Sequence, residues 1–344
     1  MPNWHETLAE LEKIRQAGSP FDRLMRDYIK KFHELTGRNV ISYYSGFLQK
    51  RGGEDVAVND SDKNGLMTVI NGLDVAKGLD LVLHTPGGDT AATESIVDYL
   101  YKKFGNDIRC FVPQMAMSAG TMIACACKEI WMGKHSSLGP IDPQYRGLPA
   151  HAIVEEFRRA VSDIQKSTSM IPVWQPIIAK YTPALLGECE KAIRWSNDMV
   201  KEWLSRNMLN NNQSIIDNIL LELGDHSVNL AHNRHLSAEK CKIIGLVVRD
   251  LESDQKLQDA VLSVHHIFMH TLNSTTAIKI IENHKGVAFI QHAQPMGMPH
   301  NMNMGYLQPD YIPVIQPGNP FQKLILDAKE NEPLPATPPH DPNP

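Results

Sequence analysis

The order of apolar and polar residues predicts a helical arm followed by an alternation of strands and helices. Over residues 4–35, Leu24, Tyr28 and Phe32 recur on one helical face, and Gly37 ends that pattern. The apolar runs that predict strands are Val40–Tyr44, Leu79–His84, Ile108–Val112 and Glu129–Met132. The segments that predict helices between them are Asn64–Ala76, Thr90–Phe104 and Ser118–Cys127. This alternation is typical of an α/β fold with a mostly parallel sheet covered by helices.

Strand patterns disappear after about residue 150, and helical patterns then dominate to about residue 283. From Gln291 the chain is rich in Pro, Met and Asn and cannot bury enough apolar surface to fold alone. We therefore expect four regions. They are an N-terminal helical arm at 1–36, an α/β core at 37–150, a mostly helical region at 151–290 and a disordered, Pro-rich tail at 291–344.

Composition and charge narrow the class of protein. Apolar residues make up 42% of the 344 residues and the formal net charge is −5, which argues against a nucleic acid as partner. The longest apolar stretch, Met115–Cys127, is shorter than the roughly 18–20 residues of a membrane span. The charged N-terminus has no signal segment, and five cysteines are too few for a disulfide scaffold. We expect a cytoplasmic protein.

Ser118 is the first candidate for chemistry. It lies in the segment Met-Ser-Ala-Gly, after a predicted strand and at the start of a predicted helix. Backbone N–H groups and the helix dipole favour negative charge at such a position, and small neighbours leave room for a substrate. A serine there is equally typical of a simple N-cap.

The segment Thr85-Pro86-Gly87-Gly88-Asp89 also follows a predicted strand and opens a helix. In a parallel sheet both turns emerge at the same edge, where ligands bind. The amides of Gly88 and Ala119 are therefore candidates for an oxyanion hole, which needs two N–H groups aimed at one developing charge. A phosphate-binding turn and a plain strand end are the alternatives for Gly87-Gly88 taken alone.

These two turns, together with Ser-Ser-Leu-Gly-Pro-Ile-Asp-Pro at 136–143, resemble the ClpP/crotonase superfamily in order and spacing. Within it, the chain is most similar to the serine dehydrogenase proteinase family, relatives of signal peptide peptidase A. Segments beginning at Pro172, Gly224 and His265 extend the resemblance to most of residues 35–290. The resemblance implies a ClpP/crotonase-like fold and Ser118 as the nucleophile of a serine peptidase.

A serine nucleophile needs a base, and the family comparison leaves that base open. ClpP-type peptidases have a histidine shortly after the nucleophile helix, whereas Leu138–Asp142 contains none, and His135 and His151 lie just outside it. Signal peptide peptidase A-type enzymes use a lysine, for which Lys180 and Lys166 are the candidates. A lysine base must be desolvated to be neutral, and Lys180 has the more apolar neighbours. We therefore expect a Ser118/Lys180 dyad, with Lys166 or His135 as alternative bases; a lysine whose stem covers the surface is the other interpretation of Lys180.

Histidines are frequent in the second half of the chain, and His266 and His270 have the i, i+4 spacing of metal ligands. No glutamate accompanies them as in zinc proteases, so we expect helix packing or oligomer contacts and neither metal nor cofactor. We expect Cys125 and Cys127 to be small core residues.

Together these features predict a cytoplasmic serine endopeptidase acting on a peptide or protein, with the helical region completing its active site. Because the apolar face of the arm needs a partner surface, we also expect a homo-oligomer. One alternative is an acyl-CoA enzyme of the crotonase type, with Glu94 or Asp142 as its acid or base. The other is a non-enzymatic oligomeric scaffold.

Overall fold

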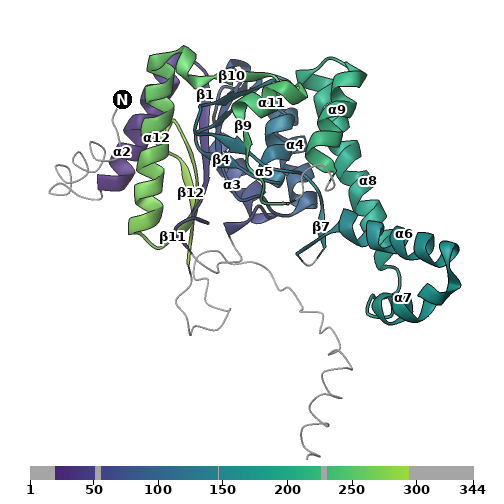
Figure 1. Cartoon of the computed structure of the whole chain (residues 1–344). Helices are drawn as coiled ribbons and strands as arrows, with labels where there is room; N and C mark the ends of the chain where they lie inside the picture. The colour runs from purple at the N-terminus through teal and green to yellow at the C-terminus, as the bar shows by residue number, and fades with distance from the viewer. Residues whose placement is uncertain (1–19, 51–55, 146, 226–230, 294–344) are drawn as a thin grey trace, which may run out of the picture. The chain divides into compact units, whose positions relative to one another are not determined.

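A seven-stranded, mostly parallel sheet forms the centre of the computed structural model shown in Figure 1. The structure describes residues 20–50, 56–145, 147–225 and 231–293. The chain divides into two compact units, Met1–Ala293 and Gln294–Pro344. The second unit lies outside the described residues, as does the first part of the expected helical arm.

The strand order in the large sheet is β10-β5-β3-β2-β1-β11-β12. The pairs from β10 to β1 are parallel, whereas β1 with β11 and β11 with β12 are antiparallel. The bounds of these strands in chain order are β1 Asn39–Ser45, β2 Leu79–His84, β3 Ile108–Val112, β5 Glu129–Met132, β10 Val248–Asp250, β11 Ala277–Asn283 and β12 Ala288–His292. The α/β fold class predicted from the sequence, a mostly parallel sheet with helices, is confirmed.

Helices cover both faces of this sheet (Figure 1). Those in the first half of the described chain are α2 Pro20–Thr36, α3 Ser61–Ile70, α4 Thr90–Phe104 and α5 Ala119–Cys125. Those in the second half are α6 Ala150–Lys166, α7 Ile171–Ile178, α8 Leu185–Trp203, α9 Gln213–Gly224, α11 Ala238–Ile244 and α12 Gln255–Ser274. Single turns of 3-10 helix, at Val75–Lys77, Thr168–Met170 and Leu251–Ser253, and a π-helical turn at Leu204–Met208 complete the described helices.

Alternate residues of the central strands enter two different hydrophobic cores. In β1, Ile41 and Tyr43 face the core shared with α3, α4 and α5, while Val40 and Tyr44 face the core formed with α2 and α12. The strand is buried along its whole length. A strand covered on both faces reads as a continuous apolar run, which is why its position was predictable.

The expectation that strands end at residue 150 is wrong. Strands β10, β11 and β12 all lie beyond it, and Gln291, the expected start of the tail, belongs to β12. The pattern of β11 is hidden because Lys279 and Glu282 interrupt its apolar residues, and both side chains are buried. Buried charges of this kind are paired in the folded state, which a sequence pattern does not reveal.

The apolar face of α2 is covered within the chain itself. Leu24, Tyr28 and Phe32 are buried in the core that α2 forms with α12. The part of the stripe that the structure describes therefore gives no reason for a partner chain, and homo-oligomerisation stays a prediction. Helices α6 and α8 have a small separate core around Ile153 and Leu185.

Charged side chains at the start of the parallel strands pair with one another. Asp80 in β2 is fully buried and accepts hydrogen bonds from Arg38 at 2.8 Å and from Arg109 at 2.7 Å.

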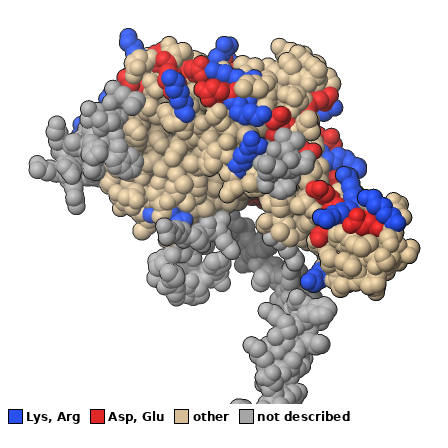
Figure 2. Space-filling model, in the orientation of Figure 1, with Lys and Arg blue, Asp and Glu red and all other residues tan. Residues whose placement is uncertain are grey.

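On the face seen in Figure 2, basic and acidic side chains are interspersed and do not form a patch of one sign. No described helix is both long and apolar enough to cross a membrane.

The buried carboxyl of Glu282 generates a prediction about pH. Burial raises its pKa from 4.5 to about 7, because Arg26 at 3.7 Å only partly offsets the loss of water. A raised pKa in the folded state gives stability that is complete below pH 4.5 and lost as the pH rises through about 7. At about 1.36 kcal/mol per pKa unit, the free energy of unfolding should fall by roughly 3 kcal/mol across that window.

Glu282→Gln should remove this fall, as measured by urea unfolding at pH 4.5, 6 and 8. The exposed Glu34, in α2, provides the matched control, and Glu34→Gln should retain the wild-type pH dependence. An unchanged pH dependence in Glu282→Gln would contradict the assignment.

Candidate active site

Ser118 has a strained backbone conformation between β4 (Met115–Ala116) and α5. Its φ is 49° and its ψ is −114°, and its side chain makes no capping hydrogen bond to α5. Ser118 occupies the N-cap position of α5, but it lacks the extended dihedrals and the hydroxyl–helix hydrogen bond of a typical capping serine. Non-glycine residues adopt such dihedrals at a cost of about 1–3 kcal/mol and cluster at functional sites. The strain frees the hydroxyl from the helix.

The backbone of Thr85 fixes the chain just before Ser118. The Met117 N–H donates to the Thr85 carbonyl at 3.0 Å, and the Thr85 N–H donates to the Met115 carbonyl at 3.2 Å. Thr85 is fully buried at the end of β2. The strained serine is therefore tied to the central sheet.

The two glycines after Thr85 are required by close contacts. Gly87 has a φ of 97°, and a Cβ there would lie 2.6 Å from the Cβ of Ser118. A Cβ on Gly88 would lie 2.3 Å from the backbone N and O of Val58. Only glycine allows the turn to approach both neighbours this closely.

The amides of Gly88 and Ala119 are free to bind a ligand. Around them, the Val58 N–H donates to the Gly87 carbonyl at 2.8 Å and the Asp89 N–H donates to the Val58 carbonyl at 2.9 Å. Among the described residues, neither the Gly88 nor the Ala119 N–H contacts an acceptor. Ala119 is the first residue of α5, whose leading N–H groups have no partner within the helix.

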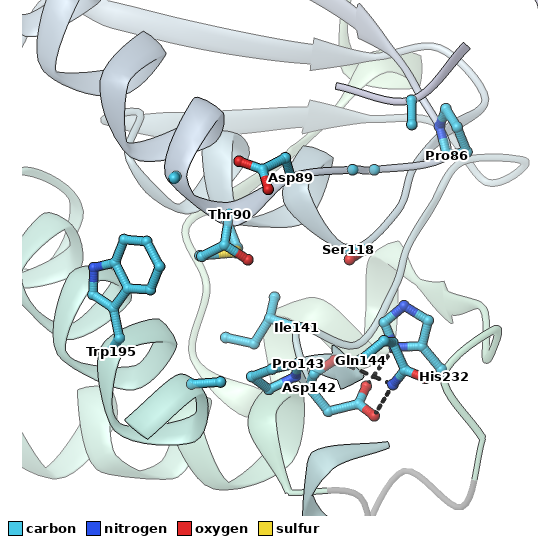
Figure 3. A pocket seen from close by; sticks show the side chains of 16 residues that line it. Pro86, Asp89, Thr90, Ser118, Ile141, Asp142, Pro143, Gln144, Trp195 and His232 are labelled. Atoms are coloured by element: carbon cyan, nitrogen blue, oxygen red, sulfur yellow. Dashed lines mark hydrogen bonds and ion pairs between the residues drawn. The ribbon is translucent and has the colours of Figure 1, made fainter. Parts of the chain in front are cut away.

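Ser118 lines a pocket of about 470 Å³, shown in Figure 3. The Pro-Gly-Gly turn and the start of α4 form one wall, and the segment after β6 (Ser137–Leu138) forms the opposite wall. Figure 3 shows the Ser118 hydroxyl pointing into this space. Met122, Ile141, Pro143, Ala192 and Trp195 contribute to the apolar part of the lining.

Asp142 and His232 form a hydrogen-bonded pair on the wall opposite Ser118. The Nδ1 of His232 lies 2.7 Å from Oδ1 of Asp142, and Nε2 of Gln144 donates to Oδ2 at 2.9 Å. The Asp142 carboxylate is fully buried, whereas the His232 side chain is 31% exposed in the pocket. Because Nδ1 faces the carboxylate, Nε2 is the ring nitrogen left to exchange a proton.

A small second sheet brings these three residues together. Its order is β4-β6-β9, with β9 at Leu236–Ser237, and β6 pairs parallel with β4 and antiparallel with β9. Ser118 follows β4, Asp142 follows β6 and His232 precedes β9. The pairing directions place all three positions at one edge. Each strand has two residues, too short for a periodic signal, so neither Asp142 nor His232 was assigned this role from the sequence.

The structure brings some of the predicted residues to this pocket and leaves others outside it. Ser118 and Gly88 line it, and Ala119 follows Ser118 directly. Lys180, after α7, is exposed, so the expected burial of this lysine is wrong, and it does not line the pocket. Lys166, at the end of α6, and His135 are also exposed and outside the lining.

Among the other histidines, His84 lies in β2, and His265, His266 and His270 lie in α12. His265 and His270 are buried in α12, and the ring centroid of His265 lies 5.5 Å from that of His84. Burial lowers the pKa of His84 to about 4 and that of His265 well below its usual value, so both are neutral. Within the part of the chain that the structure describes, no group of three or more His, Cys, Asp or Glu side chains is arranged to hold a metal ion. Cys125 and Cys127 are buried, as expected.

Sequence comparison identifies the class to which this fold and site belong. Residues 55–281 match the family described as ClpP-like SDH-type serine proteinases, and the chain belongs to that family.

Two curated relatives come from Methanocaldococcus jannaschii. "Uncharacterized protein MJ0137" is 34% identical over 116 residues, which cover 34% of this chain and 40% of the relative. "Uncharacterized protein MJ1495" is 38% identical over 93 residues, covering 27% and 32%. The chain thus spans less than half the length of either relative.

The glycine contacts predict a specific effect on the reactivity of Ser118. Gly88→Ala should slow labelling of Ser118 by a fluorophosphonate by on the order of 10²-fold, because the turn must move away from Val58 and take an oxyanion donor with it. Labelling rates measured by mass spectrometry test this.

Gly105→Ala is the matched control, because Gly105 also has a positive φ, of 59°, but has open space around its Cβ position. It should lower stability by about 1 kcal/mol and leave labelling unchanged. Equal labelling rates in both variants would show that the close approach of Gly88 is unimportant.

Proposed function

We propose that the chain is a serine peptidase in which Ser118 is the nucleophile, His232 the general base and Asp142 the residue that orients the base. One observation carries the proposal: the buried Asp142 holds His232 at 2.7 Å in a pocket whose opposite wall presents the strained Ser118. The membership in a family of serine proteinases supports it independently.

The reaction follows from this geometry. The Ser118 oxygen attacks the carbonyl carbon of a peptide bond while Nε2 of His232 takes the hydroxyl proton. The carbonyl oxygen becomes negatively charged and is held by the N–H groups of Gly88 and Ala119. His232 then returns the proton to the leaving amine, and an acyl–Ser118 ester remains.

The second half of the reaction uses the same groups. A water molecule gives a proton to His232 and its oxygen attacks the ester carbon, again with negative charge at the two amides. The carboxylic acid leaves as His232 reprotonates Ser118. Asp142 stabilises the imidazolium in both halves without itself taking the proton. The Ser118 side chain makes no capping hydrogen bond to α5. Catalytic hydrogen bonds of a serine often form or tighten only when substrate binds.

The support for His232 exceeds the support for a lysine base. Lys180 is exposed and lies outside the pocket lining, so nothing desolvates it as a neutral base requires. The Ser118/Lys180 dyad stays a prediction that one variant tests. For an acyl-CoA enzyme, Asp142 has both oxygens engaged. Glu94 accepts a hydrogen bond from Trp195 at 3.4 Å and does not line the pocket. The peptide substrate, cytoplasmic location and homo-oligomeric state are part of the proposal.

Four variants assayed on one fluorogenic peptide test the mechanism. Ser118→Ala and His232→Ala should each reduce kcat on the order of 10⁴–10⁶-fold, because either loss disables the same step. Asp142→Asn should reduce it on the order of 10⁴-fold, since an amide favours the wrong imidazole tautomer. Lys180→Arg should retain wild-type turnover.

His235→Ala is the matched control, because His235 lies in the same segment but bonds to Ser137 instead of Asp142. It should leave kcat within about twofold of wild type. Turnover that persists in folded Ser118→Ala would overturn the peptidase mechanism. Loss of turnover in Lys180→Arg with retention in His232→Ala would assign the base to the lysine.

A further inference from the structure

A completely buried ion pair lies behind the Pro-Gly-Gly turn. Nζ of Lys279, in β11, lies 2.7 Å from Oδ1 of Asp62, in α3, and neither side chain has exposed surface. Two charges without water are retained only where their geometry and hydrogen bonds compensate for desolvation. Apolar residues of similar volume would serve stability as well, so the pair calls for another explanation.

The hydrogen bonds of this pair converge on one short segment. Lys279 also donates to the Ala57 carbonyl at 2.8 Å. The other Asp62 oxygen, Oδ2, accepts from the Asn59 N–H at 2.9 Å. The ion pair is therefore hydrogen-bonded to the backbone on both sides of Val58, at Ala57 and at Asn59.

Val58 in turn holds the oxyanion turn. It forms a parallel bridge with Gly88, donating to the Gly87 carbonyl at 2.8 Å and accepting from the Asp89 N–H at 2.9 Å. These bonds orient the peptide planes on either side of Gly88. The position of the Gly88 amide is therefore set by Val58, and that of Val58 by Lys279 and Asp62.

Tyr43 provides a second connection from the ion pair to the same turn. Its hydroxyl donates to Oδ2 of Asp62 at 2.8 Å and lies near enough to the side chain of Thr85 for that side chain to lower the pKa of Tyr43. The Thr85 hydroxyl accepts from the Gly87 N–H at 3.3 Å. Burial, and then the charge of Asp62, raise the pKa of Tyr43 well above its usual value, so the hydroxyl keeps its proton.

We propose that Lys279, Asp62 and Tyr43 are positioning residues for catalysis, which fix the Gly88 amide at the place where the oxyanion forms. The inference rests on the proposed peptidase function and adds residues that do not touch substrate. A preorganised donor stabilises the transition state more than the bound substrate, because the charge appears only in the transition state. A variant in which the Gly88 N–H is held less firmly should therefore have a lower kcat and an unchanged KM.

The test compares two variants with wild type on one fluorogenic peptide. Tyr43→Phe removes a single hydrogen bond and keeps the ion pair. Asp62→Asn/Lys279→Met removes both charges together, so that no unpaired charge is left buried. Each is measured for kcat, KM, inhibition by a peptide boronic acid that forms a tetrahedral adduct with Ser118, and thermal unfolding.

The matched control is Asp80→Asn/Arg109→Met, which removes an ion pair at the opposite end of the strands, with a fully buried aspartate and an arginine that is 18% exposed. We expect kcat to fall on the order of 10–100-fold in the Asp62/Lys279 variant and about 3–10-fold in Tyr43→Phe, with KM within about twofold. The inhibition constant of the boronic acid should rise by the same factors. The control should unfold at a lower temperature with kcat and inhibition unchanged.

Folded variants with wild-type kcat and inhibition would overturn the positioning role, as would a control that loses kcat equally. If the double variant does not fold, Tyr43→Phe decides by the same criteria. A wild-type protein without Ser118-dependent turnover would instead overturn the proposed function, which separates the two failures.

Discussion

The contact between the glycine turn and the serine turn is the constraint on which the site depends. The backbone of Gly87 lies where a Cβ would be only 2.6 Å from the Cβ of Ser118, and the Thr85 carbonyl holds the amide just before that serine. This contact keeps Ser118 at a φ of 49° and so directs its hydroxyl away from α5. A Cβ on Gly87 would also lie 3.0 Å from the Ala119 nitrogen, so the glycine turn closely approaches the start of α5 as well.

The large sheet supports the turns of the site, and the small sheet brings the side chains of the site together. The parallel strands β2 and β3 are buried between two cores and form a rigid support for the turns at their carboxyl ends. The small β4-β6-β9 sheet then collects Ser118, Asp142 and His232 from three distant parts of the chain. Its two-residue strands depend on the large sheet for support, because such short strand pairs are not stable alone.

Buried charges connect the edge of the sheet to the site. Asp80, Asp62, Lys279 and Glu282 are all buried, and each has a partner of opposite charge. Those near the strand starts join β2 to β3, whereas Lys279 and Asp62 join the antiparallel strand β11 to the segment that holds Gly88. Charge burial therefore occurs where the fold must fix one particular arrangement, which apolar packing alone specifies less sharply.

The sequence by itself determined the strands β1, β2, β3 and β5, the helices between them and the two turns at Gly88 and Ser118. Apolar runs, glycines and a serine at a helix start are local signals, and they act within a few residues. Only the tertiary structure decided the rest. Strand β11 was hidden by Lys279 and Glu282, whose charges are tolerated through partners far away in the chain. Asp142 and His232 meet through strand pairing across about 90 residues, and Lys180, beyond the end of α7, is exposed. Long-range pairing and burial have no signature in the residues beside them, which is why the base could not be chosen from sequence alone.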